Sequence, residues 1–309
     1  MSRGIKGRTK FAWETARLAF EPLAGEPQKP ELVRPGELGV TFIGHSSFLI
    51  QMAGKNILVD PVFAKWLIVL RRVRRPGVEV QDLPPIDLVL QTHAHMDHLN
   101  FPSLRAIVDH TRSIRGKAPE IIVPHGVDDL VAPLGFARIH TMRWWQQFTS
   151  GALRIVMTPS QHWGKRFFVD DHRGYGGYVL ESGSHSIYHS GDTAYFSGFQ
   201  QIARLHPKLA LLPIGAYSPD SFRSVHTTPE DALQAFLDLG SDCMIPMHYG
   251  TFRLSKEPID EPLPRLLAAA QHAKVADRIT TLREGETLLL SNRPSAQPSA
   301  DPAGQMIHS

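Results

Sequence analysis

Three histidines and an aspartate within six positions are the residues best suited to chemistry: His93, His95, Asp97 and His98. They follow residues 87–92, an apolar run that predicts a buried strand. In extended backbone, residues two apart point the same way, so His93 and His95 can bind one ion while Asp97 and His98 turn toward a second. Neutral imidazole and ionised carboxylate are ligands that zinc, iron and manganese accept. The pattern predicts the metal site of a hydrolase, because a solvent-exposed His-rich turn does not account for the buried strand before it.

Three further candidate ligands each lie just past a predicted strand, where loops usually carry functional groups. A lone histidine in such a loop is more often structural, but their joint occurrence with the first cluster favours a shared site. The complete set predicted for two divalent metal ions, zinc first and iron or manganese as alternatives, is His93, His95, Asp97, His98, His162, Asp192 and His248.

The elements that must position these residues are short strands and a few helices. Helices are predicted at 102–110 and at 229–239, where Thr228 caps the start and Gly240 ends the helix. A hairpin and a third strand come first, and later strands alternate with helices, which favours two sheets flanked by helices in an α/β fold. The predicted strands are 40–44, 48–52, 56–59, 86–92, 121–124, 153–159, 177–180, 186–189, 209–213, 244–247 and 287–290.

Composition is that of an ordinary globular protein. The chain has 309 residues, 42% of them hydrophobic, and a formal charge of +3, which is too weak to argue for nucleic acid. Its one cysteine, Cys243, excludes an internal disulfide and fits a reducing compartment. We find no run of 18 apolar residues and no secretory h-region, so we expect a cytoplasmic protein.

Three zones are expected along the chain. Residues 1–37 form a basic, Pro-rich N-terminal arm, and residues 38–291 form the hydrolase domain. Residues 292–309 are mainly Pro, Ser and Ala with little to bury, which predicts a disordered tail.

The motifs together resemble those of the metallo-beta-lactamase superfamily, whose signature is the His-x-His-x-Asp-His run at 93–98. The resemblance narrows to the branch that contains N-acyl-phosphatidylethanolamine-hydrolysing phospholipase D. It implies an αββα four-layer sandwich with the metals at one edge. The narrowing motifs lie at 42–47, 56–63, 83–87, 161–166, 191–193 and 247–252.

The resemblance also implies roles for the candidate ligands. His93, His95 and His162 would bind the first metal, Asp97, His98 and His248 the second, and Asp192 would bridge both. Two ions about 3.5 to 4 Å apart can share a water and lower its pKa toward neutrality. The metal-bridging hydroxide would be the nucleophile, and Asp97 would also orient it.

Other polar residues are candidates for supporting roles. Asp60 is expected to hold a ligand imidazole by its other N–H, or else to cap the Asp60-Pro61 turn. His45 is predicted to line the site, and His226 matches a substrate-side histidine of the family, although it can also be a helix-entry residue. Lys165 and Arg166 can meet a phosphate or remain a solvated pair.

Residues 64–75 depart from the relatives, which usually carry Ser, Pro and Gly here. In this chain an apolar stretch, 66–70, precedes four arginines in five positions. One interpretation is peripheral contact with the inner face of a membrane, helped by the basic N-terminal arm. The other is a lid packed on the core with a solvated basic end.

Two enzyme hypotheses remain open from the sequence. The first is a phosphodiesterase of the N-acyl-phosphatidylethanolamine phospholipase D type, in which hydroxide attacks phosphorus and phosphatidate separates from the ethanolamide. The alternative is a lactonase or other ester or amide hydrolase acting on a small polar metabolite, phosphorylated or not, because it needs the same metals. No basic stripe is interleaved with aromatics, so no nucleic acid partner is expected.

Overall fold

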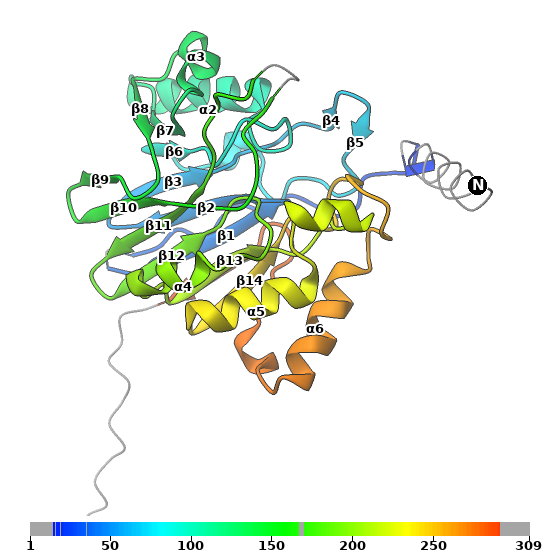
Figure 1. Cartoon of the computed structure of the whole chain (residues 1–309). Helices are drawn as coiled ribbons and strands as arrows, with labels where there is room; N and C mark the ends of the chain where they lie inside the picture. Colours follow the sequence, from blue (N-terminus) through cyan, green and yellow to red (C-terminus); the bar gives the residue numbers. More distant parts are fainter. Residues whose placement is uncertain (1–14, 16, 19, 35, 167–169, 291–309) are drawn as a thin grey trace, which may run out of the picture.

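The computed structural model describes residues 15, 17–18, 20–34, 36–166 and 170–290 (Figure 1). The basic stretch 1–10 and the predicted tail 292–309 lie outside these residues. Part of the predicted N-terminal arm runs along the body, because Arg75 N–H donates to the Ala24 carbonyl at 2.8 Å. In the part of the chain that is described, no helix combines the length and the apolar composition needed to cross a membrane.

Two mixed β-sheets form the centre of the molecule. The first has the strand order β15-β1-β2-β3-β6-β7-β8 and the second the order β14-β13-β12-β11-β10-β9. The strands of the first sheet are β1 (Leu38–Gly44), β2 (Ser47–Met52), β3 (Lys55–Val59), β6 (Leu88–Leu90), β7 (Glu120–Pro124), β8 (Arg138–Met142) and β15 (Thr287–Leu290). Those of the second are β9 (Gln147–Ser150), β10 (Leu153–Thr158), β11 (Gly177–Ser182), β12 (His185–His189), β13 (Leu209–Pro213) and β14 (Cys243–Met247).

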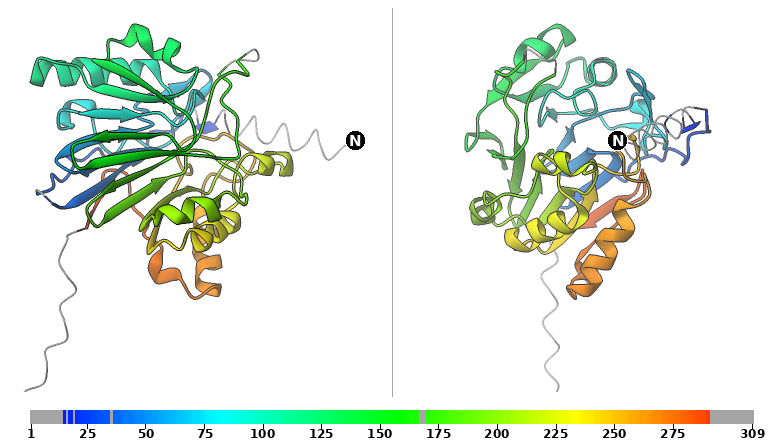
Figure 2. Two further views of the ribbon diagram at one scale, coloured as in Figure 1. Left: turned by 60° about the vertical axis from the view of Figure 1, so that its left-hand side comes forward. Right: turned by 45° about the vertical axis from the view of Figure 1, so that its right-hand side comes forward.

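The sheets pack face to face, and helices cover their outer faces (Figure 2). Buried side chains from both sheets, such as Phe48 and Leu180, form one hydrophobic core between them. A second core lies under α2 and includes Ile107, and a third lies under α5 and α6 and includes Phe236. The helices are α2 (Phe101–Arg115), α3 (Asp128–Val131), α4 (Phe199–Ile202), α5 (Pro229–Leu239) and α6 (Pro262–His272). These four layers confirm the predicted αββα sandwich of the α/β class.

Helix ends follow local chemistry. The side chain of Asn100 accepts a hydrogen bond from Ser103 N–H at 3.1 Å, so α2 begins one residue earlier than predicted. It continues to Arg115 and stops at Gly116, whose φ of 72° suits glycine. The α5 helix has the predicted bounds, with a capping box between Thr228 and Asp231.

The sequence missed elements that lack a clear hydrophobic period. They include the edge strands β8 and β9, the helices α3, α4 and α6, and a small hairpin, β4 (Trp66–Leu67) and β5 (Leu70–Arg71). The edge strands carry polar or half-buried residues, so their pattern is weak. The α6 helix contains two prolines in its first turn, and prolines so close together are more typical of a loop.

Strand direction decides where the functional loops meet. β3, β6 and β7 run parallel, as do β12, β13 and β14. β10 pairs antiparallel with β11, which pairs antiparallel with β12, so β10 and β12 also end on the same side. The loops that follow these strands therefore converge on one edge of the sandwich.

Candidate metal centre

The seven predicted ligands converge at this edge, although they span 156 positions in the chain. In the first half-site, His93 Nε2 lies 2.8 Å from His95 Nδ1, which lies 3.2 Å from His162 Nε2. Asp192 Oδ2 faces this trio at 4.0 Å from His93 Nε2 and 3.9 Å from His162 Nε2. One ligand atom from each of the four residues lies within 4.8 Å of the others, close enough to surround one ion.

The second half-site contains Asp97, His98 and His248. Asp97 Oδ2 lies 3.7 Å from His98 Nε2 and 3.5 Å from His248 Nε2. Asp192 Oδ2 lies 3.2 Å and 3.1 Å from the same two nitrogens. Asp192 therefore borders both half-sites, which is the position expected of a bridging carboxylate.

Unpartnered buried atoms indicate that this donor set fits a metal cation. His98 Nε2, His248 Nε2 and Asp192 Oδ1 are buried, and the two nitrogens lie beside Asp192 Oδ2 without the geometry of a hydrogen bond. Buried polar atoms are normally hydrogen-bonded, so three such atoms in one cluster require a further partner. A divalent cation supplies that partner, since imidazole nitrogen and carboxylate oxygen are its usual ligands.

The protonation states support the same conclusion. Burial lowers the pKa of His93 and His162 well below the usual value, so both are neutral imidazoles at pH 7. Burial alone would raise the pKa of Asp192, but His248 and His98 hold it well below its usual range. Against the effect of burial, Asp192 raises the pKa of His248 to about 9. The carboxylates thus favour positive charge at this position, which metal ions would also provide.

Hydrogen bonds outside the cluster orient the ligands. Asp60 Oδ2 accepts from His98 Nδ1 at 2.7 Å, which is the contact predicted for Asp60. Its carboxylate also accepts from Thr92 N–H at 2.8 Å and from Thr92 Oγ1 at 2.6 Å. Because the Thr92 hydroxyl donates to Asp60, it accepts from His93 Nδ1 at 2.9 Å. His162 Nδ1 donates to the Val225 carbonyl at 2.9 Å, so in all three histidines Nε2 is the nitrogen left to bind metal.

His45 and His226 both lie at the cluster. His45 Nε2 donates to Asp97 Oδ2 at 3.1 Å, and its ring lies 4.2 Å from that of His248. His226 Nδ1 lies 3.8 Å from Asp192 Oδ2. Burial lowers the pKa of His45 to about 3 and that of His226 to about 4, so both are neutral at pH 7.

Two basic residues considered for phosphate binding are engaged elsewhere. Arg166 Nη1 donates to the carbonyls of Ala94 and Leu99, both at 2.8 Å, and so ties together the loop that carries the His-rich motif. Lys165 forms an ion pair with Asp171. Arg166 therefore stabilises this loop, and a phosphate contact of Lys165 or Arg166 stays a prediction.

One residue at the site was not singled out from the sequence. The Trp163 ring stacks on His162 with centroids 4.9 Å apart and meets His95 edge-on at 5.5 Å. Trp163 is 41% exposed, so one face is available beside the first half-site. Its position directly after His162 in a family motif was the available signal.

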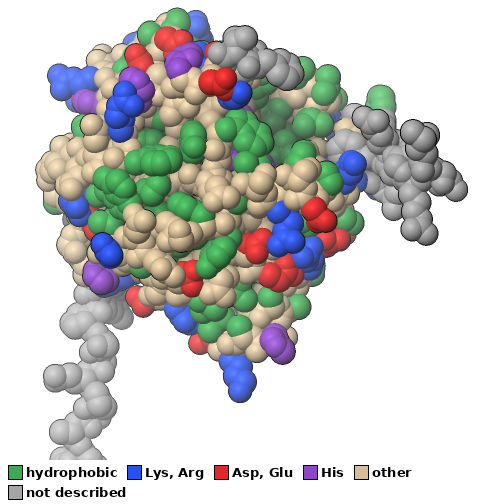
Figure 3. All heavy atoms as spheres, viewed as in Figure 1, with side chains coloured by type: hydrophobic (Ala, Val, Ile, Leu, Met, Phe, Trp, Pro, Cys, Tyr) green, Lys and Arg blue, Asp and Glu red, His purple; other side chains and the backbone are tan. Residues whose placement is uncertain are grey.

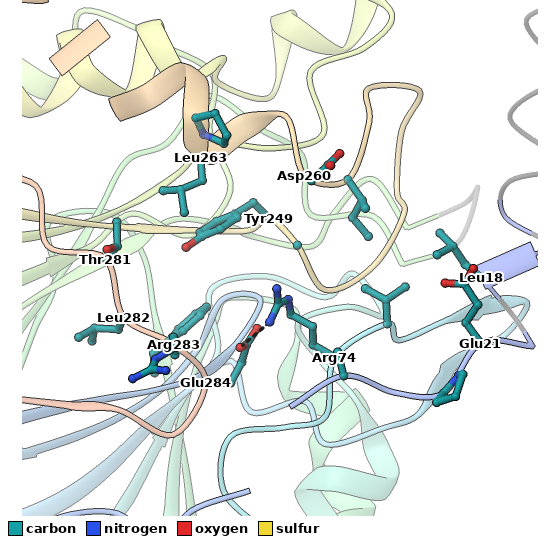
Figure 4. A pocket seen from close by; sticks show the side chains of 17 residues that line it. Leu18, Glu21, Arg74, Tyr249, Asp260, Leu263, Thr281, Leu282, Arg283 and Glu284 are labelled. Atoms are coloured by element: carbon teal, nitrogen blue, oxygen red, sulfur yellow. Dashed lines mark hydrogen bonds and ion pairs between the residues drawn. The ribbon is translucent and has the colours of Figure 1, made fainter. Parts of the chain in front are cut away.

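A cavity of about 540 Å³ is lined in part by Tyr249 and Gly250, which directly follow His248 in the chain (Figure 4). Phe42, Leu263 and Leu282 line its apolar part, and Arg74 and Glu284 form an ion pair in its wall. The cavity that His248 itself borders is much smaller, about 20 Å³. The larger cavity is thus separate from the cluster.

Comparison with known proteins shows the class of protein to which this chain belongs. Residues 55–249 match the family described as the beta-lactamase superfamily domain. An uncharacterised protein of Mycobacterium tuberculosis is 35% identical over 285 residues, covering 86% of this chain and 75% of that protein. The chain therefore belongs to the beta-lactamase superfamily.

Within the superfamily, the relatives define a branch. The N-acyl-phosphatidylethanolamine-hydrolyzing phospholipase D of Saccharomyces cerevisiae is 29% identical over 263 residues, which cover 80% of this chain and 55% of the yeast protein. A UPF0173 metal-dependent hydrolase of Pelotomaculum thermopropionicum is 32% identical over 258 residues, or 81% of this chain and 99% of the relative. The fold agrees with that of a metallo hydrolase from Ignicoccus hospitalis, with a TM-score of 0.62, 24% identity, and coverage of 83% of this chain and 100% of the other. This protein is a metal-dependent hydrolase of the branch that the sequence motifs indicated.

Proposed function

We propose that this protein is a dinuclear phosphodiesterase of the N-acyl-phosphatidylethanolamine phospholipase D type. The observation that carries the proposal is the position of Asp192 Oδ2, within 4.0 Å of both His93 and His162 and within 3.2 Å of both His98 and His248. One carboxylate between two sets of imidazoles suits two ions better than one. The yeast relative, named for hydrolysis of a phospholipid, supports the substrate class.

Each half-site would hold one ion. His93, His95 and His162 are assigned to the first, Asp97, His98 and His248 to the second, and Asp192 to both. Two divalent ions, zinc first with iron or manganese as alternatives, would supply Lewis acidity and a shared water of lowered pKa as the nucleophile.

The protein side chains then orient the nucleophile and the substrate. Asp97 is half-buried and fixed by His45, so we assign it to orient the nucleophile and accept its proton. His226 is neutral and lies beside Asp192, and we assign its ring N–H to hydrogen-bond a substrate oxygen. In the reaction, water adds to phosphorus and the P–O bond to the acylethanolamine breaks, giving phosphatidate and the alcohol.

The alternative is hydrolysis of a lactone or another ester or amide of a small polar metabolite. The same ligands serve both reactions, so the substrate must be tested directly. On the face shown in Figure 3, charges of both signs are interspersed without a basic stripe, which gives no support to a nucleic-acid substrate.

The deciding experiment is hydrolysis of N-acyl-phosphatidylethanolamine in mixed micelles by zinc-loaded protein. A soluble phosphodiester and a simple lactone are assayed in parallel. Asp97→Ala is the test variant, and His272→Ala, on the exposed end of α6, is the matched control. We expect acylethanolamine release that Asp97→Ala abolishes and His272→Ala retains. Turnover of the lactone alone would overturn the proposal in favour of the alternative.

A further inference from the structure

The β4–β5 hairpin presents an apolar tip to solvent, and Figure 1 shows it standing out from the two sheets. Ile68 is 73% exposed, Val69 is 74% exposed and Trp66 is 44% exposed. Tight turns usually contain Gly, Asn or Asp, because these residues tolerate positive φ and solvent. Ile68 instead adopts a φ of 54°, which is unfavourable for a β-branched residue. Local folding therefore does not explain an isoleucine at this position.

The base of the hairpin is firmly attached to the body. Leu67 is buried against Val62 and Phe252. Arg72 is fully buried, donates to the carbonyls of Val62 and Ala64, and lies 4.9 Å above the Phe252 ring. The lid interpretation thus holds for the base of the hairpin, while its tip remains free.

The hairpin also adjoins the metal centre. The Phe252 ring that supports Leu67 meets the ring of His45 edge-on at 5.3 Å. His45 in turn donates to Asp97. A surface that binds the tip would therefore lie close to the metal centre.

The arginines of this segment contribute less free charge than the sequence suggested. Arg71 donates to the backbone carbonyls of Leu18 and Glu21. Arg72 is buried, and the other two arginines form ion pairs, Arg74 with Glu284 at 3.5 Å and Arg75 with Glu26 at 3.3 Å. Arg71 and Arg72 are therefore held by the protein itself, whereas Arg74 and Arg75 remain about half-exposed.

Next to the tip, the positive charge comes from a lysine. Lys65 is exposed beside Trp66. The contacts of Arg71 bring the backbone of Leu18 and Glu21 to the hairpin. Phe20 adds a further aromatic side chain that is 88% exposed.

We propose that the β4–β5 hairpin is a membrane-insertion element for an anionic bilayer. Ile68 and Val69 enter the boundary of the acyl chains, and Trp66 lies at the level of the headgroups, where tryptophan is enriched. Lys65 contacts anionic lipid. A protein partner is a poorer fit, because three side chains on a narrow tip cover far less area than a stable protein interface.

This inference deepens the proposed function by naming the surface from which a lipid substrate would arrive. Its test does not depend on turnover. Zinc-loaded protein is sedimented with phosphatidylcholine vesicles that contain or lack phosphatidylglycerol. The variant is Ile68→Ser/Val69→Ser, and the matched control is Ile114→Ser/Leu267→Ser, which removes exposed apolar side chains from α2 and α6.

We expect binding to the anionic vesicles, weakened roughly ten-fold or more by the hairpin variant and unchanged in the control. Quenching of tryptophan fluorescence by brominated lipid should fall in Trp66→Phe. The midpoint of thermal unfolding should be the same in the wild type and the hairpin variant, which shows that the variant is folded. Equal vesicle binding by the wild type and the hairpin variant, or no binding by the wild type, would overturn the inference. Vesicle binding without hydrolysis of the lipid would support the surface while removing the proposed substrate.

Discussion

At the scale of single residues, the side chains that orient the ligands matter as much as the ligands themselves. Asp60 accepts hydrogen bonds from His98, Thr92 and Gln91, so all of its acceptor capacity serves the loop that holds the ligands. Its sequence context, directly before a proline, also suited a simple turn. The hydrogen bond to His98 resolves that ambiguity in favour of an orienting role.

Replacing Asp60 should therefore weaken metal binding without unfolding the protein. In Asp60→Asn, one acceptor oxygen becomes an NH₂ group that faces donors from Thr92 and His98. We expect zinc affinity to fall about 10- to 100-fold. Competition with a chromophoric chelator measures this, with Asp109→Asn on the exposed surface of α2 as control. An unchanged affinity would contradict the role assigned to Asp60.

Trp163 is a second single residue with a testable role, and we expect it to contact substrate rather than to hold metal. Its exposed face beside His162 suits packing against an apolar or planar group. Loss of one aromatic contact costs about 0.5 to 1.5 kcal/mol, so Trp163→Ala should raise KM a few-fold while metal content stays constant. Trp163→Phe should restore most of the affinity. A large fall in kcat or in bound metal would show instead that Trp163 positions His162.

At the scale of elements, Arg72 joins the hairpin to the body. Its guanidinium is buried, and burial lowers its pKa to about 10, yet it remains charged at neutral pH. Arg72→Met should leave the carbonyls of Val62 and Ala64 without a donor, at a cost of about 2 kcal/mol. Urea unfolding measures the loss, and Arg105→Met on the exposed face of α2 should change little. Equal stability of the two variants would mean that the hairpin base does not need the cation.

At the scale of the whole molecule, the metal centre connects the two sheets. His93 and His98 follow β6 of the first sheet, whereas His162, Asp192 and His248 follow strands of the second. Removing metal should therefore lower the stability of the entire sandwich. With free zinc at about 100 times its Kd, the linkage contributes about 2.7 kcal/mol. Thermal unfolding with a chelator, and after zinc is restored, measures the effect, which Asp192→Ala should abolish. A Tm that is independent of zinc in the wild type would contradict this coupling.

The sequence identified the metal ligands better than it identified the residues that orient them. His93 to His98 form a local pattern, and each remaining ligand follows a strand whose hydrophobic run is easy to recognise. Thr92 and the Val225 carbonyl have no such signal, because a threonine or a backbone oxygen acquires its role only from what the fold places beside it. Arg166 is a case in which the sequence suggested a different role. Its position near His162 suggested phosphate binding, whereas in the structure its Nη1 donates to two backbone carbonyls.

The sequence by itself determined the donor types, the order of the strands that deliver them, and the class of fold, because hydrophobic periodicity and helix caps are local properties. Only the tertiary structure decided that Asp192 lies between the two half-sites, that Asp60 serves His98, and that Ile68 and Val69 remain in solvent. These facts depend on strand direction and sheet packing, which bring together residues that are far apart in the chain. Local sequence patterns do not encode such contacts.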